Sequence, residues 1–164
     1  MTEERLKAMK GKVHIKAWQK QSDGSEKLIK DTTFDNLLVN TGKDSILRTL
    51  GALTCGGTPG SIGIGDSTQA AALADTDMIA ASNKYWKVIL ASDKTYVRPT
   101  LFLTTDFGFS EGNFTWNEIG LCDNQGSPGY SPAEGSKLWA RQIDGSPLIK
   151  DVSKRAIIEW QLTL

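Results

Sequence analysis

The sequence predicts an all-β protein, an antiparallel β-sandwich or jelly-roll-like domain with one short helix near residues 41–50. The clearest signal is the C-terminal segment, in which every second residue from Ala156 to Leu164 is apolar; Ile157 alone breaks the alternation. This period of two is typical of a strand with one face on a core and one in water. Turn-forming residues separate further apolar segments, and five Trp, five Phe, three Tyr and sixteen Gly suit a turn-rich sandwich.

The N-terminal part predicts an arm and a hairpin. Residues 1–11 are charged and are expected to form a flexible arm, whereas residues 12–164 are expected to form a single domain. Apolar and polar residues alternate over 13–18, which predicts the first strand. Turn residues at 22–25 then lead to a return strand over 27–34.

A helix is expected next. Asn40 or Thr41 is predicted to cap it, an apolar stripe covers one side, and Gly51 is a natural end. A glycine-rich loop follows and leads into a short strand over 62–65. The alanine-rich stretch 69–81 fits a short helix and a long surface loop equally well.

The second half predicts further strands, with an exposed loop over 123–135. Pro99 places one of these strands near an edge or at a bulge, because proline cannot donate to a sheet ladder. The terminal strand is expected to lie close to a sheet edge or a neighbouring subunit. The expected strands are 84–90, 96–104, 115–122, 138–143, 147–150 and the closing segment 156–164.

Composition excludes several function classes. Nineteen basic and nineteen acidic residues cancel, so no net field attracts nucleic acid or an anionic membrane. No apolar run reaches membrane-spanning length, and the charged start of the chain does not resemble a signal peptide, so no membrane insertion is expected. Cys55 and Cys122 are expected to be free thiols, with a disulfide as the alternative.

No metal site or cofactor is predicted. The chain has no CxxC motif and no His/Cys cluster, although a calcium site in a loop stays open. The spacing of the glycines from Gly60 to Gly65 matches neither the GxGxxG motif nor the Walker A motif, so no phosphate-binding loop is predicted. His14 is the single histidine, which excludes a histidine-based triad, and the scattered acids give no catalytic pair. The protein is therefore expected not to be an enzyme.

Two groups of residues have clear structural roles. Gly63 and Gly65 flank Ile64 and leave one strand face bare, so that another backbone or a Trp ring can approach closely. Asp66 follows as a turn former whose carboxylate can accept local N–H groups. Similarly, Asn40 and Gly42 allow the chain to leave a strand and begin a helix.

Glu118 is the most informative polar residue. It is expected to share a strand face with Trp116, half-buried, and a carboxylate in that position needs hydrogen-bond donors. Arg141 is the candidate donor. A structural ion pair, or a carboxylate bonded to backbone N–H groups, is favoured over a catalytic carboxylate because no catalytic partner is present.

Several short segments occur in a characteristic order along the chain. They are 36–44, 62–68, the segment 116–121 with Trp116, Glu118 and Gly120, the pair 138–141 and 148–150, and the closing strand with Trp160. In this order they resemble segments of a family of small β-rich structural proteins from tailed bacteriophages, found in tail fibres, baseplates and capsid decorations. Ser67 departs from the family, in which glycine is common at this position.

The resemblance implies a non-enzymatic part of the virion, made in the bacterial cytoplasm. It implies a homo-oligomer, often a trimer, in contact with other virion proteins. A tail, baseplate or fibre-attachment component is slightly favoured, and a capsid decoration protein is the alternative. A glycan-binding module that recognises the host surface is a further alternative, with Tyr85, Trp86 and Tyr130 as the aromatic residues that would stack on sugars.

Overall fold

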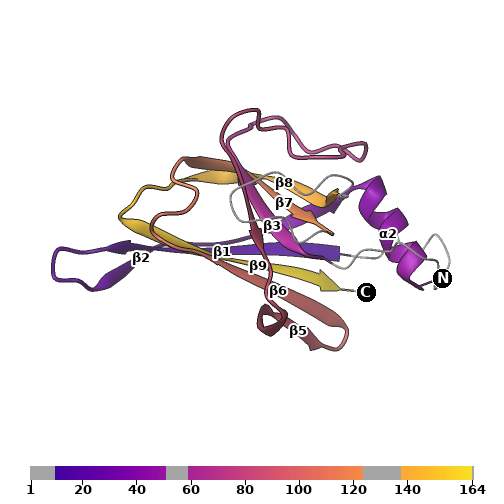
Figure 1. Cartoon of the computed structure of the whole chain (residues 1–164), viewed down its shortest axis with the longest axis horizontal. Coiled ribbons are helices and arrows are strands. Elements are labelled where there is room, and N and C mark those ends of the chain that lie inside the picture. The colour runs from indigo at the N-terminus through magenta and orange to yellow at the C-terminus, as the bar shows by residue number, and fades with distance from the viewer. Residues whose placement is uncertain (1–9, 51–58, 124–137, 164) are drawn as a thin grey trace.

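The computed structural model describes residues 10–50, 59–123 and 138–163 and has the predicted all-β class (Figure 1). Nine strands in this part of the chain form one antiparallel sheet in the order β4-β3-β7-β8-β2-β1-β9-β6-β5. Within the described ranges the sheet is accompanied by one α-helix, α2 (Asn40–Leu50), and a 3₁₀ turn, η1 (Ala91–Asp93). The strands are β1 (Lys10–Lys20), β2 (Glu26–Leu38), β3 (Ser61–Gly65), β4 (Lys84–Val88), β5 (Lys94–Val97), β6 (Thr100–Phe107), β7 (Thr115–Cys122), β8 (Leu138–Ile149) and β9 (Lys154–Thr163).

The sheet is curled, so that its two halves enclose the main core. In Figure 1, β3, β7 and β8 lie above β1, β9 and β6. The strand β2 joins the halves, since it pairs with β1 over most of its length and with β8 at Leu37 and Leu38. Aromatic rings meet across the gap: the centroids of Phe107 on β6 and Trp116 on β7 are 5.1 Å apart in an edge-to-face arrangement.

The C-terminal strand confirms the predicted alternation. Ala156, Ile158 and Trp160 are fully buried, and they face the core beside Val13 and Ile15 of β1. However, β9 pairs with β1 on one side and β6 on the other, so it is an interior strand and the expected position near an edge is wrong. The edges of the described sheet are β4 and β5.

Several element boundaries differ from the predictions. The expected strand 96–104 is two strands, β5 and β6, which form a hairpin with Arg98 and Pro99 in the turn. Proline favours such a turn because it has no N–H to give to a ladder. The expected strands 138–143 and 147–150 are one continuous strand, β8. The strand β1 begins at Lys10, so the sheet includes two residues of the predicted arm.

The predicted helix is present, with its start shifted. It begins at Asn40, and the Lys43 N–H donates to the Val39 carbonyl, which places Val39 at the cap position. The Thr41 hydroxyl donates to the Leu138 carbonyl on β8 instead of capping the helix. The expected stop at Gly51 lies outside the described residues. Segment 69–81 is a loop without helix.

A second layer covers the outer face of β3 and β7. There Gly63 pairs with Gly120 on one side and with Trp86 of β4 on the other. Because neither glycine has a side chain, the Trp86 ring and Met78 lie directly over them, as the bare strand face predicted. The small apolar cluster formed here comprises Val39, Met78, Trp86, Cys122 and Leu138.

We expect Gly63→Ala to destabilise the fold. A Cβ at this position would lie 2.6 Å from Cε3 of the buried Trp86 ring, which cannot move without disturbing the layer. Overpacking of this kind costs roughly 1–3 kcal/mol in the free energy of unfolding, measurable by urea titration. Gly145→Ala is the matched control because nothing lies within 4 Å of a Cβ there. Equal stability of both variants would contradict close packing over Gly63.

Candidate functional site

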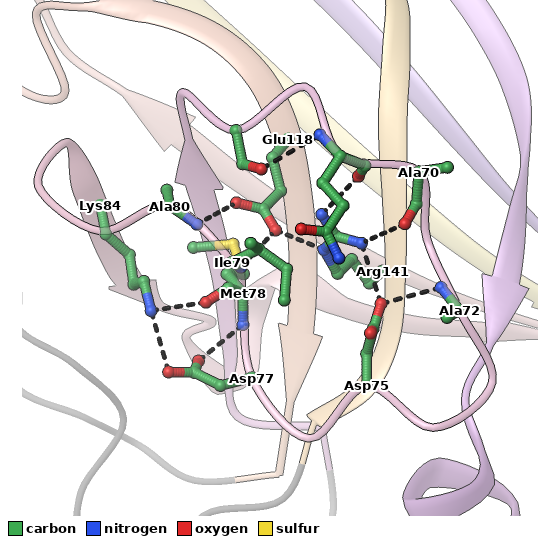
Figure 2. A network of polar contacts seen from close by, with 12 residues as sticks. Ala70, Ala72, Asp75, Asp77, Met78, Ile79, Ala80, Lys84, Glu118 and Arg141 are labelled. Atoms are coloured by element: carbon green, nitrogen blue, oxygen red, sulfur yellow. Dashed lines mark hydrogen bonds and ion pairs between the residues drawn. The ribbon is translucent and has the colours of Figure 1, made fainter.

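A fully buried ion pair lies at the centre of the outer layer. Glu118 on β7 and Arg141 on the neighbouring strand β8 have side chains that are 0% exposed, and the Arg141 Nε–H donates to Glu118 Oε1. The predicted pairing is therefore confirmed. Figure 2 shows the two side chains meeting beneath the loop 66–83.

The pairing of β7 with β8 is irregular where the Glu118 side chain changes direction. Trp116 pairs with Leu148 and Glu118 with Ile143, so residues 144–147 of β8 lie opposite Asn117 alone. Trp116 lies in the main core, while Glu118 contacts the loop on the outer face. The expectation that these two residues share one face is wrong, because the regular alternation does not continue across this irregular pairing.

Glu118 holds the second half of the loop through backbone donors. Its Oε1 accepts the N–H of Ile79 at 2.7 Å, and its Oε2 accepts the N–H of Ala80 at 3.0 Å. With Arg141 as the third donor, both oxygens of the buried carboxylate have hydrogen-bond partners. Gly65 leaves the space for this arrangement, since a Cβ there would lie 2.7 Å from Glu118 Oε2.

Arg141 holds the first half of the loop. Its terminal nitrogens donate to the carbonyl oxygens of Ala70 at 3.1 Å and Gln69 at 2.7 Å. A second carboxylate, Asp75, accepts from Arg141 at 2.8 Å and also accepts the Ala72 N–H at 2.9 Å. The guanidinium thus connects two carboxylates and two backbone carbonyls (Figure 2).

Further contacts fix the ends of the loop. Asp66 was expected to accept local N–H groups; its Oδ2 accepts the Asn83 side-chain amide at 2.7 Å, which joins the two ends of the loop. Lys84 donates to the Asp77 carboxylate at 2.9 Å and to the Met78 carbonyl at 2.7 Å. The loop is therefore closed at its base as well as held at its centre.

The helix α2 is fixed to the same region. The N–H of Asn40 donates to the Leu73 carbonyl in the loop, at 2.9 Å. Gly42 packs against β8 so closely that a Cβ would lie 2.1 Å from the Trp139 carbonyl oxygen. The predicted motif residues Asn40, Gly42, Gly63, Gly65, Asp66, Glu118, Gly120 and Arg141 thus gather around one loop, while Trp116 and Trp160 lie in the main core.

Two of the three predicted sugar-stacking aromatics, Tyr85 and Trp86, lie within the described residues. Trp86 is 1% exposed beneath the loop, so its ring cannot stack on a glycan, and this prediction is wrong for it. Tyr85 is half-buried against Phe107, and its hydroxyl donates to Glu111. Burial, together with the Glu111 charge, raises the pKa of Tyr85. Tyr130 lies outside the described residues, as does Cys55.

A second polar cluster was not anticipated from the sequence. Glu111 Oε2 accepts from the Lys87 ammonium at 2.5 Å and from the Gly108 N–H at 2.8 Å. Burial opposes ionisation of Glu111, but these donors outweigh it and lower the pKa of this carboxyl. Lys150 lies nearby, 2% exposed, and lysine is rarely buried to that extent. The only sequence signal is its place after the apolar pair Leu148-Ile149.

The Glu118 site has a structural role, because its hydrogen bonds hold the loop 66–83 on the sheet. Both oxygens of Glu118 and all three nitrogens of the Arg141 guanidinium have partners within the protein. The described residues contain no group of three His, Cys, Asp or Glu side chains arranged to hold a metal ion. The described helix is too short and too polar to cross a membrane.

Comparison of the chain with models of known protein families, with curated proteins and with solved structures finds no match. The interpretation of function consequently depends on the residues and their geometry.

We expect Glu118→Gln to lower the free energy of unfolding by about 3–5 kcal/mol, because it leaves the buried Arg141 charge without its full counter-charge. Glu26→Gln is the control: Glu26 forms an ion pair with Arg155 that is 32% and 26% exposed, where the loss should be roughly 0–1 kcal/mol. Urea titration measures both. Similar losses of unfolding free energy in the two variants would show that burial does not increase the contribution of the Glu118–Arg141 pair to stability.

We expect Asp75→Asn to loosen the loop while the sheet stays folded, since it removes only the outermost partner of Arg141. Hydrogen exchange followed by mass spectrometry should show faster exchange of the amides in residues 69–80 and unchanged exchange in β1 and β9. Unchanged exchange in the loop would contradict a role for Asp75 in holding it.

Proposed function

We propose that this chain is a structural protein of a tailed-phage particle that acts by self-association, as a tail, baseplate or fibre-attachment component. The supporting observation is where the phage-like segments lie. Segments 62–68 and 116–121 are neighbouring strands in register, with Gly63 beside Gly120 and Gly65 beside Glu118. The pair 138–141 and 148–150 supplies Arg141 and the next strand.

These segments build a scaffold. Their characteristic residues are glycines that admit close packing and charged residues whose polar groups are all used internally. A resemblance of this kind concerns how the protein is built, and it favours a building element of a particle over an enzyme or a ligand-binding module.

The two sheet edges differ in a way that favours one of them for the proposed self-association. The edge strand β4 carries Lys84 and Lys87, and lysine on an edge opposes pairing with another chain. The other edge strand, β5, displays Tyr96 and Val97 with 65% and 60% of their surfaces exposed, and Leu90 precedes it with 60% exposed. Large apolar side chains beside an edge favour contact with a second copy of the chain.

Oligomeric state and particle position test the proposal. Native mass spectrometry of the purified chain should give a homo-oligomer, expected as a trimer, and immunolabelling of the phage particle should mark its tail. Labelling spread over the capsid would assign the chain to shell decoration. A monomeric chain that is absent from purified particles would overturn the proposal.

We expect the double variant Tyr96→Ser/Val97→Ser to dissociate the oligomer, because a specific interface usually buries roughly 1,200 Å² or more and these side chains supply its apolar part. The control is Ile149→Ser/Val152→Ser, which removes two side chains that are 68% and 72% exposed elsewhere. Native mass spectrometry and size-exclusion chromatography report the state of each variant. An intact oligomer in the first variant would place the interface away from β5.

A further inference from the structure

The side chain of Lys150 lies against an asparagine amide. Lys150 directly follows β8, and its Nζ donates to Asn113 Oδ1 at 2.9 Å and to the Gly108 carbonyl oxygen at 2.8 Å. Both acceptors belong to the connection between β6 and β7. The backbone is also fixed there, since the Lys150 N–H donates to the Phe114 carbonyl at 3.2 Å. Hydrogen bonds from the side chain and from the backbone of Lys150 thus hold its amine next to the Asn113 amide.

The surroundings favour the neutral amine. The Lys150 residue is 2% exposed, and both of its Nζ acceptors are uncharged oxygens. Burial lowers the pKa of Lys150 to about 8, although the charges of Glu111, Asp151 and Asp106 act in the opposite direction. About half of the Lys150 side chains are therefore unprotonated and nucleophilic near pH 8, a much larger share than for an ordinary lysine.

We infer that Lys150 and Asn113 join through an intramolecular isopeptide bond. The lone pair of the neutral Nζ attacks the Asn113 side-chain carbonyl carbon, and a tetrahedral intermediate forms. One Nζ proton passes to Nδ2, the Cγ–Nδ2 bond breaks and ammonia leaves. The product is a secondary amide between Nζ and Cγ. No oxidant or reductant takes part, and the reaction gains its rate from the enforced proximity of the two groups.

Glu111 is the positioning residue of this site. The Gly108 peptide lies between the two side chains: its carbonyl accepts from Lys150, and its N–H donates to Glu111 Oε2. Asn113 itself is exposed, which gives the released ammonia a direct route to solvent. Glu111 therefore acts through position, because it fixes the loop residue Gly108 beside the amine and the amide.

The mass of the purified wild-type chain, measured under denaturing conditions after incubation at pH 8, tests the inference directly. We expect a mass lower than the sequence mass by one ammonia molecule, and a protease digest in which the Asn113 and Lys150 peptides are joined. A chain of full mass would overturn the inference. Loss of ammonia without a joined peptide would overturn it as well, because cyclisation of an asparagine alone has the same mass.

Variants separate the bond from the fold. Asn113→Ala retains Lys150 and should have the full mass expected from its sequence. The control Asn117→Asp removes a different asparagine, which donates to the Asp66 carbonyl. This control should still be lighter than its sequence mass by one ammonia molecule. Glu111→Gln should slow the appearance of the joined peptide. In the wild type its rate should be half-maximal near pH 8 and level at higher pH, as the fraction of neutral Lys150 does. A rate that does not change with pH would contradict attack by this amine.

Discussion

Burying the charges of Glu118 and Arg141 is the constraint on which the outer layer depends. Removing a carboxylate and a guanidinium from water costs several kcal/mol for each ion, and only complete pairing offsets this cost. Arg141 and the Ile79 and Ala80 amides supply the partners of Glu118, and the loop also supplies the remaining partners of Arg141. The loop is therefore a condition for the ion pair, and the ion pair fixes the loop. Gly65 matters for the same reason, because a side chain there would meet the carboxylate.

Charged side chains also hold the connection between β6 and β7, but by a different principle. Glu118 and Arg141 compensate each other, whereas Lys150 is buried against neutral oxygens and gives up part of its charge. The first arrangement is chemically inert, since both carboxylate oxygens and all three guanidinium nitrogens have hydrogen-bond partners. The second leaves an amine with nucleophilic character beside an amide. Buried ionisable groups thus occur in two forms within one sheet: the Glu118–Arg141 pair is inert, whereas Lys150 is reactive.

Much of the fold could be predicted because its strands alternate regularly. The period of two in β9 identified its buried residues, and the polar residues in segments 116–121 and 138–141 allowed Glu118 and Arg141 to be paired in advance. The irregular pairing between Trp116 and Glu118 could not be predicted, because it depends on the partner strand and not on local sequence. Asp75 and Lys150 were missed for a related reason: their partners are distant in sequence and come together only in the folded chain. The turn at Pro99 could have been predicted, because a proline between two apolar segments more often marks a turn than a strand.

The position of β9 has a consequence for how the chain folds during synthesis. This last strand separates β1, the first, from β6, so β5 and β6 have no place in the sheet until residues 154–163 have left the ribosome. Until then, the apolar face of the β1–β2 hairpin lacks half of its neighbours. Pairing of such distant segments is slow because a long loop must close first. Completion of the sheet in the nascent protein therefore depends on residues 154–163, and a chain that stalls before Lys154 would present two incomplete sheet edges to the cell.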